Sequence, residues 1–209
     1  MRPWIVGLTG ASGMVYGVRL IQILLESKQK VAVVFSEASR HVVREELGIS
    51  LKSLHKVSDL QAILGDVSTD SLEVFSAKDF TAPIASGSYP SQGMVIVPCS
   101  MGTLGAVASG LSQNLIHRAA DCTLKEGRKL IVVPRETPLS AIHLENMLKL
   151  SRLGVGMIPA MPGFYSGAKT LDEIIDFMVG KILDQMNIPH ALFPRWTGPL
   201  QKSLQGYEA

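Results

Sequence analysis

Several segments of the sequence place small, hydroxyl-bearing or charged residues directly after short apolar runs, where parallel-sheet proteins bind ligands. The first is Gly7–Gly17 (GLTGASGMVYG), which holds four glycines and Ser12. Small residues let the backbone approach a ligand, and the amides that start a following helix attract an anion. Because the spacing is not GxGxxG and no P-loop lysine follows, the segment predicts a monophosphate-sized anion site. A tight strand-to-helix turn built from small residues is the alternative interpretation.

Hydroxyl residues follow two further apolar runs. Ser36 comes directly after Val31–Phe35, and an N-cap of the next helix is its simplest role. Pro98–Leu104 (PCSMGTL) opens another expected helix, so it is a second candidate for binding a phosphate or the polar edge of a ring. Cys99 within it has two interpretations, a nucleophile or a small buried packing residue, and the second is the more common.

A charged pair stands between two prolines after another apolar run. Arg135 and Glu136 follow Pro134 directly, and Thr137 separates them from Pro138. Arginine matches phosphate geometry bidentately, and a glutamate in an apolar site has its pKa raised towards acid–base use. A surface ion pair is the alternative. After the last apolar run, Pro159–Tyr165 (PAMPGFY) adds a rigid loop with two aromatic residues.

The remaining polar residues give weaker signals. Arg118, Asp121 and Lys125 have helical spacing, which is typical of a solvated, salt-bridged helix face. The five histidines form no HxxH or HxxxH pair, so no metal site is predicted, and the lack of GxSxG leaves a hydrolase triad unsupported. The residues alone therefore predict an anion site at the first loop and a second cationic site near Arg135, but they name no reaction.

Strands and helices must alternate along the chain to position these loops. Continuous apolar runs predict strands covered on both faces, at Trp4–Thr9, Val31–Phe35, Leu72–Phe75, Met94–Pro98, Leu130–Val133 and Val155–Ile158. Helical spacing and capping residues predict helices between them, at Met14–Ser27, Glu37–Leu47, Ser58–Leu64, Leu115–Glu126, Ala141–Leu153 and Leu171–Met186. This alternation predicts an α/β fold with a central parallel sheet.

The composition narrows the class of protein. The chain has 209 residues, and its 20 Lys and Arg against 18 Asp and Glu give a net charge of +2, too balanced for nucleic-acid binding through phosphate neutralisation. No apolar run reaches the ~18 residues of a membrane span. Two cysteines do not make a disulfide framework, so we expect a cytoplasmic protein. We expect one domain over 1–209, with a tail from about 187 to 209 that packs on the body or on a neighbouring subunit.

Several longer motifs, in order along the chain, resemble the UbiX-type flavin prenyltransferase family. They are TGASGMVYG (Thr9–Gly17), FSEASRHVVREE (Phe35–Glu46), ASGSYP (Ala85–Pro90), VIVPCSMGTLGAVASG (Val95–Gly110), IHRAADCTLKEGRKLIVVPRETPLS (Ile116–Ser140), HLENMLKLSRLG (His143–Gly154), MPGFY (Met161–Tyr165) and PRW (Pro194–Trp196). The resemblance covers the chain from about residue 4 to residue 196.

The family resemblance implies a fold and a reaction. The implied fold is a flavodoxin/Rossmann-like three-layer sandwich, assembled into trimers that pack as a dodecamer. The implied reaction transfers a dimethylallyl group from dimethylallyl phosphate to N5 and C6 of reduced FMN, without a metal. The prenylated FMN serves UbiD-type decarboxylases as cofactor. The 18% of charged residues, against ~25% in an average domain, then reflects surface buried between subunits.

The resemblance also implies roles for individual residues. It places FMN contacts at Gly10, Ala11, Ser12, Ser36, Ser100, Met101, Gly102, Thr103 and Arg135, with Ser12 close to flavin N5 and Ser36 at the phosphate end. It places the donor phosphate at Tyr165, Lys181 and Lys125, with Glu46 and Arg118 bordering that site from a neighbouring subunit. Trp196 walls the prenyl pocket and Glu136 passes a proton to the leaving phosphate, so Ser12, Lys125, Trp196 and Glu136 form the catalytic set.

Related flavoproteins provide the alternatives. Some family members have arginine where this chain has Lys181, which keeps the positive charge without the bidentate fork. FMN-dependent cysteine decarboxylases share the fold but carry a PxSxN-type motif, which Pro98–Thr103 lacks. A non-catalytic flavoprotein is the other alternative, and the presence of Glu136, Lys125 and Tyr165 argues against it.

Overall fold

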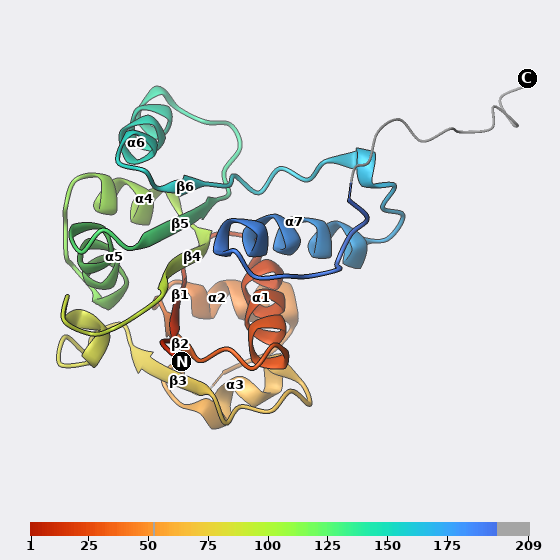
Figure 1. The fold of residues 1–209 in the computed structure, drawn as a ribbon, viewed down its shortest axis with the longest axis horizontal. Coiled ribbons are helices and arrows are strands. Elements are labelled where there is room, and N and C mark those ends of the chain that lie inside the picture. Colours follow the sequence, from red (N-terminus) through yellow and green to blue (C-terminus); the bar gives the residue numbers. More distant parts are fainter. Residues whose placement is uncertain (52, 196–209) are drawn as a thin grey trace, which may run out of the picture.

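A six-stranded parallel sheet forms the centre of the structure, a computed structural model that describes residues 1–51 and 53–195 (Figure 1). The strands are β1 (Trp4–Leu8), β2 (Val31–Phe35), β3 (Leu72–Ser76), β4 (Gly93–Cys99), β5 (Lys129–Pro134) and β6 (Gly156–Met157). Their order is β3-β2-β1-β4-β5-β6. This is the doubly wound order of Rossmann folds, in which the direction of winding changes between β1 and β4. The predicted α/β fold is confirmed.

Two layers of helices cover the sheet (Figure 1). One face carries α1 (Met14–Glu26), α2 (Ser39–Leu47), α3 (Val57–Leu64) and α7 (Leu171–Met186), and the other carries α4 (Met101–Ala108), α5 (Leu115–Lys125) and α6 (Ala141–Arg152). Every residue of β1, β2 and β4 is buried, because helices lie against both sides of these strands. This burial explains why the strands are continuous apolar runs in the sequence.

Side-chain caps set the starts of three helices. Asn114, Ser140 and Thr170 each accept a hydrogen bond from the backbone amide three residues further on, at 3.0, 3.3 and 3.2 Å respectively. These caps confirm the predicted starts of α5, α6 and α7. The predicted start at Glu37 is two residues early, because the Ser36 hydroxyl caps a turn by accepting from Ser39 N–H and α2 begins at Ser39.

The described part of the chain after α7 turns back along that helix (Figure 1). Ile188 and Leu192 pack against the apolar core between α1, α7 and the sheet. The short 3-10 turns η1 (Pro83–Ala85) and η2 (Phe164–Ser166) interrupt the two longest connections near the sheet. The loops after β1, β4 and β5 therefore meet at one edge of a rigid scaffold, which is where the candidate site forms.

Candidate active site

A carboxylate already occupies the start of α1. Gly13 N–H lies 3.0 Å from both Glu46 oxygens, and Met14 N–H donates to Glu46 Oε2 at 2.8 Å. The first amides of a helix have no partner within the helix and can therefore bind an anion. A negative side chain at this position also interacts favourably with the positive end of the helix dipole. The predicted anion site at these amides is therefore wrong, because Glu46 of the same chain fills it. No local pattern of residues predicts this contact, because it joins residues 33 positions apart.

The loops after β1 and β4 are tied together by a buried hydroxyl. Thr9 Oγ1 donates to Pro98 O at 2.8 Å and accepts from Ser100 N–H at 2.8 Å. Ser100 in turn caps α4 by accepting from Thr103 N–H at 3.3 Å. A Cβ on Gly10 would lie 2.5 Å from Ala38 Cβ, so this glycine lets the loop after β1 lie directly against the loop after β2. Thr9 was not among the predicted site residues.

The loop after β5 brings a guanidinium to this edge. Arg135 Nε donates to the backbone oxygen of Ser12 at 3.3 Å, and Arg135 N–H donates to Cys99 O at 3.3 Å. The Glu136 carboxylate accepts from Thr137 N–H at 3.0 Å. Among the ion pairs of the described residues, Arg135 and Glu136 do not pair with each other. The alternative of a surface ion pair between them is therefore wrong, and both groups face the cavity described next.

Two cavities meet at the switch point of the sheet. The smaller one, about 380 Å³, is lined by Gly10, Ala11, Ser12, Glu46, Arg135 and Glu136 among others. The larger one, about 600 Å³, is lined by Ser36, Gly102, Thr103, Phe80 and Lys78 among others. Both are lined in part by Gly10 and Ser100, so they lie next to each other. Volumes of ~300–1,000 Å³ with a few convergent polar groups are typical of cofactor sites.

A buried histidine adds an unpaired polar atom beside the larger cavity. His117 is 6% exposed and lines the cavity, and its Nδ1 has no hydrogen-bond partner among the described residues. Burial lowers the pKa of this imidazole, because desolvation disfavours the charged form. The hydroxyls, backbone groups, guanidinium and imidazole around the two cavities fit an elongated ligand with a polar ring edge at one end and a phosphate at the other. FMN has these features, and Ser36 lines the larger cavity.

Tyr165 and Lys181 form a separate patch at α7, on the face of the sheet that also carries α1 and α2. The Tyr165 ring in η2 packs edge-on against Phe177 of α7, with 5.6 Å between ring centroids. Lys181 follows Phe177 by one helical turn, so the phenol and the ammonium lie on the same side of α7. The tyrosine is 60% exposed. Two of the predicted donor-phosphate residues thus lie on the same side of α7, and neither of them lines the cavity of Arg135.

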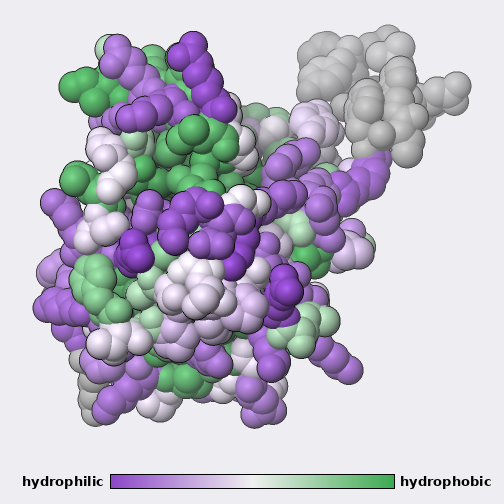
Figure 2. All heavy atoms as spheres, turned by 60° about the vertical axis from the view of Figure 1, so that its left-hand side comes forward, coloured by the Kyte–Doolittle hydropathy of each residue, from purple (hydrophilic) through white to green (hydrophobic). Residues whose placement is uncertain are grey.

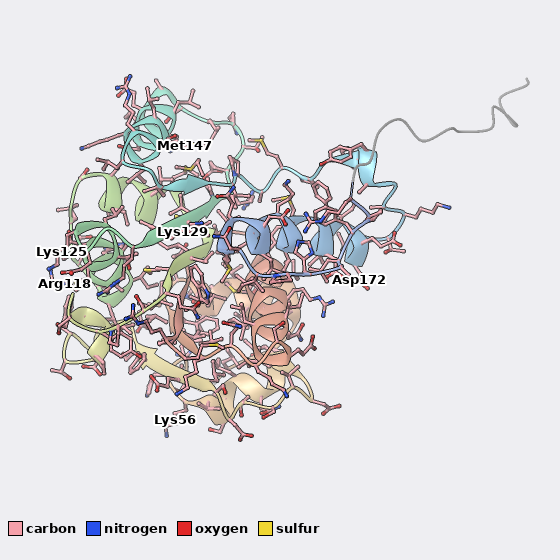
Figure 3. All side chains as sticks on the ribbon, viewed as in Figure 1. Lys56, Arg118, Lys125, Lys129, Met147 and Asp172 are labelled. Atoms are coloured by element: carbon pink, nitrogen blue, oxygen red, sulfur yellow. The ribbon has the colours of Figure 1, made fainter. Side chains whose placement is uncertain are left out.

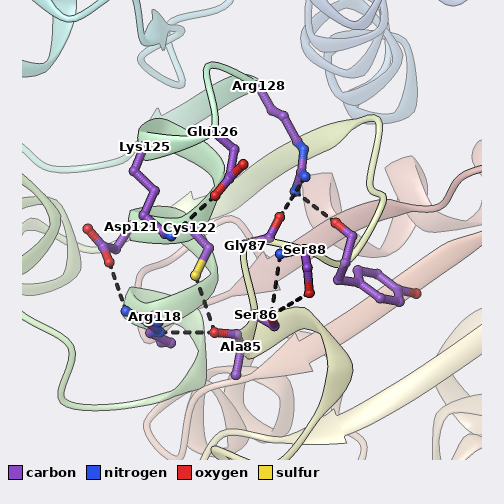
Figure 4. Close-up of polar contacts among 11 residues, drawn as sticks. Ala85, Ser86, Gly87, Ser88, Arg118, Asp121, Cys122, Lys125, Glu126 and Arg128 are labelled. Atoms are coloured by element: carbon purple, nitrogen blue, oxygen red, sulfur yellow. Dashed lines mark hydrogen bonds and ion pairs between the residues drawn. The ribbon is translucent and has the colours of Figure 1, made fainter.

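Arg118 and Lys125 lie on the outer face of α5, on the opposite side of the molecule from the start of α7 at Asp172 (Figure 3). Arg118 pairs with Asp121 at 3.1 Å and donates to Ala85 O at 3.0 Å, whereas Lys125 pairs with Glu126 at 3.2 Å (Figure 4). The predicted salt-bridged helix face is confirmed. Within one chain, Arg118 and Lys125 do not converge with the other predicted phosphate ligands.

The turn that follows η1 packs against this face of α5. Arg128 holds the turn by donating to Gly87 O at 2.7 Å and to Tyr89 O at 2.8 Å (Figure 4). A Cβ on Gly87 would lie 2.8 Å from Lys125 Nζ, so the ammonium rests directly on the turn. The ASGSYP motif thus borders the two cations on the outer face of α5.

The other sequence predictions have varied outcomes. Cys99 is fully buried, which raises the pKa of its thiol to about 12, so the packing interpretation holds and the nucleophile does not. The described residues contain no group of three or more metal-ligating side chains. In the same part of the chain, no helix is long and apolar enough to cross a membrane. Trp196 lies outside the described residues.

Comparison with known proteins first shows which broad class of proteins this chain resembles. The Flavoprotein family model matches residues 1–183, in agreement with a doubly wound sheet that carries ligand-sized cavities at its switch point. Solved structures of PPC decarboxylase and of the peptidyl-cysteine decarboxylase EpiD are similar, with TM-scores of 0.56 and sequence identities of 19% and 15%. At these identities the likeness extends to the fold alone.

More similar relatives give the family. The chain is 55% identical over 191 residues to flavin prenyltransferase UbiX of Halalkalibacterium halodurans, with 91% of each chain covered. It is 44% identical to flavin prenyltransferase UbiX of Methanothermobacter thermautotrophicus, over 93% of this chain and 95% of the relative. The structure of AnUbiX (PadA1) in complex with FMN and dimethylallyl pyrophosphate superposes with a TM-score of 0.82 at 36% identity, covering 94% and 98% of the two chains.

A dodecameric FMN-dependent UbiX-like decarboxylase from Escherichia coli O157:H7 superposes with a TM-score of 0.81 at 42% identity, over 94% of this chain and all of that one. The chain therefore belongs to the UbiX flavin prenyltransferase family, as the motifs predicted.

Proposed function

We propose that this protein is a flavin prenyltransferase that joins a dimethylallyl group to N5 and C6 of reduced FMN. The C1–O bond of dimethylallyl phosphate breaks as the N5–C1 bond forms, inorganic phosphate leaves and N5 loses its proton. Protonation of C2 of the prenyl double bond then allows C3 to bond to C6, which loses its proton. The flavin supplies the nucleophilic N5 and C6. The product is a cofactor for a UbiD-type decarboxylase. UbiX relatives at 44% and 55% identity, together with a related structure that holds FMN and a dimethylallyl donor, support this function.

The pair of adjacent cavities at Gly10 and Ser100 is the observation that carries the proposal. Anaerobic incubation of the protein with reduced FMN and dimethylallyl phosphate, followed by mass spectrometry of the flavin, tests it directly. We expect the flavin mass to increase by one prenyl group. Unmodified flavin with both the monophosphate and the diphosphate donor would refute the proposal.

The residues around the two cavities have different roles in the proposed reaction. Ser12 and the Arg135 guanidinium orient the reacting edge of the flavin, and the hydrogen bond between Arg135 and the Ser12 backbone fixes both loops in one geometry. Glu136 passes a proton to the leaving phosphate, and its carboxylate lies on the wall of the same cavity. Ser36 takes the phosphate of FMN in the larger cavity. The small loop residues, Ala11, Met101, Gly102 and Thr103 among them, let the flavin lie close to the backbone.

The donor phosphate site is completed by more than one subunit. Tyr165 and Lys181 share one patch, whereas Arg118 and Lys125 lie on the far side of the same chain (Figure 3). A neighbouring copy that presents its α5 to this patch would unite the four groups. A leaving phosphate held by fixed cations is the main stabilisation that an allyl phosphate needs in order to ionise.

Exposed apolar side chains support this assembly. Ile142, Leu144 and Leu148 of α6 are 69%, 51% and 50% exposed, a degree of apolar exposure that marks interaction sites. Figure 2 shows hydrophobic side chains on the α4–α6 side of the molecule. The proposal therefore includes a homo-oligomer, as in the dodecameric relative. It also includes a cytoplasmic location, because a reducing compartment suits a reaction that consumes reduced flavin.

A further inference from the structure

One carboxylate of α7, that of Asp184, contacts two side chains of the segment that follows the helix. Arg195 contacts Asp184 through two pairs of atoms: Arg195 Nη1 lies 2.7 Å from Asp184 Oδ2, and Arg195 Nη2 lies 2.7 Å from Asp184 Oδ1. His190 Nε2 lies 3.2 Å from Asp184 Oδ1. Bidentate guanidinium–carboxylate pairs are among the stronger and more directional ion pairs in proteins. The hydrogen bond from Arg195 is the main reason why the pKa of Asp184 lies below its usual value.

Aromatic packing fixes the same segment on the helix. Phe193 lies 5.0 Å from Phe177 and 5.3 Å from His190 between ring centroids, and the Arg195 guanidinium lies 5.1 Å from the Phe193 centroid. The segment approaches α7 at Gly180, where a Cβ would collide with the rings of Phe193 and His190. The position of Arg195 beside Asp184 is therefore set by packing as well as by charge.

The cation next to this carboxylate is Lys181. Its Nζ lies 3.9 Å from Asp184 Oδ2, which is beyond hydrogen-bonding distance, and its side chain is 46% exposed. Asp184 is its one ion-pair partner among the described residues. Arg195 already pairs with both carboxylate oxygens of Asp184 and donates a hydrogen bond to Oδ2, whereas Lys181 is too far away to donate one. Without Arg195, the carboxylate would keep its contact with His190 and would lie within reach of the lysine.

We propose that Arg195 neutralises Asp184 and thereby keeps Lys181 available to the phosphate of the prenyl donor. This inference rests on the proposed function, which assigns Lys181 to that phosphate. Arg195 is thus a positioning residue that acts through Asp184. Loss of Arg195 converts Asp184 into an intramolecular competitor for Lys181, and the cost falls on donor binding and not on the chemical step.

Steady-state prenylation of reduced FMN, with dimethylallyl phosphate varied, tests the inference. Arg195→Gln should raise KM for the donor by about two- to fivefold, the effect of one partly exposed ion pair, while kcat stays near the wild-type value. Adding Asp184→Asn to that variant should return KM to the wild-type value, because the competitor is gone. Arg195→Lys, which keeps the charge without the fork, should give an intermediate KM.

A matched control comes from another ion pair of α7. Arg19 of α1 pairs with Asp176 of α7 at 2.7 Å, and Arg19→Gln removes an equally close ion pair without touching Lys181. This control should leave KM unchanged.

The possible results separate the two proposals. A purely structural role for Arg195 predicts that the double variant is no better than Arg195→Gln, and that result, or a fall in kcat at constant KM, overturns the inference. If Arg195→Gln does not fold, as judged by circular dichroism, the same comparison is made with Arg195→Lys and its Asp184→Asn double variant. A wild-type KM in Lys181→Gln would remove the phosphate role of Lys181, whereas absence of prenylated flavin with the wild-type protein would refute the proposed function itself.

Discussion

The Glu46 contact with the start of α1 predicts a measurable loss of stability when the carboxylate is removed. In Glu46→Ala, the amides of Gly13 and Met14 lose three short contacts to a charged acceptor. Hydrogen bonds to charged groups contribute ~1.5–3 kcal/mol, and the charge–dipole interaction contributes ~0.3–1 kcal/mol. Water replaces part of this at a half-open site, so we expect a loss of about 2–3 kcal/mol in the free energy of unfolding.

Urea unfolding followed by circular dichroism measures this difference. Glu45→Ala is the matched control, because Glu45 is the neighbouring glutamate, is exposed, and makes one long contact of 3.8 Å to Arg44. We expect the control to lie within about 0.5 kcal/mol of the wild type. A Glu46→Ala protein as stable as the Glu45→Ala protein would refute the assignment of Glu46 as the anion at this helix start.

An added anion provides a second measurement. If the amides vacated in Glu46→Ala can bind an oxyanion, inorganic phosphate should restore part of the lost stability. Phosphate also stabilises folded proteins generally, so the effect is compared with that on Glu45→Ala. Equal stabilisation of the two variants by phosphate would contradict the expected specific site.

Three further predictions concern catalysis, assembly and pH. Glu136→Gln should bind FMN as the wild type does but form prenylated FMN at least tenfold more slowly, at about the lower end of general acid–base effects; wild-type rates would exclude the acid–base role. Inactive Lys125→Ala and Tyr165→Phe proteins, dissociated and reassembled together, should recover activity if one site uses both residues from different chains, and mixtures that stay inactive would contradict the shared site. The Arg195 contact lowers the pKa of Asp184 in the folded protein. The ionised carboxylate therefore stabilises the fold at any pH above its unfolded-state pKa. This stabilisation is lost as the pH falls through the lower pKa of the folded state. The stability difference between wild type and Asp184→Asn should therefore shrink as the pH falls below about 4, and a difference that stays constant or grows over this range would refute this linkage.

Local features of the fold were readable from the sequence because they depend on nearby residues. Unbroken apolar runs such as Val31–Phe35 identify buried parallel strands, and the caps at Asn114, Ser140 and Thr170 act over three residues. The same reasoning misplaced the start of α2, because Ser36 closes a single turn before the helix begins.

The candidate site was only partly predictable, because its geometry depends on long-range contacts. The loops of Ser12, Ser100 and Arg135 could be assigned to one edge, since each follows a parallel strand. The cap from Glu46 could not, because it connects residues that no local rule relates. The buried Thr9 hydroxyl likewise joins two strands that are 89 residues apart in sequence.

The carboxylate at the start of α1 also determines which sign of charge the smaller cavity favours. Glu45 and Glu46 line this cavity, against the single guanidinium of Arg135. Fixed negative charges stabilise positive charge that develops beside them and oppose a second anion. In the proposed reaction, these two carboxylates would therefore stabilise an allyl group that becomes cation-like beside the flavin, and they would oppose retention of the departing phosphate in the same cavity. The proposed lysine site for that phosphate would then separate the two ions of the breaking bond and favour release of the phosphate once the transfer is complete.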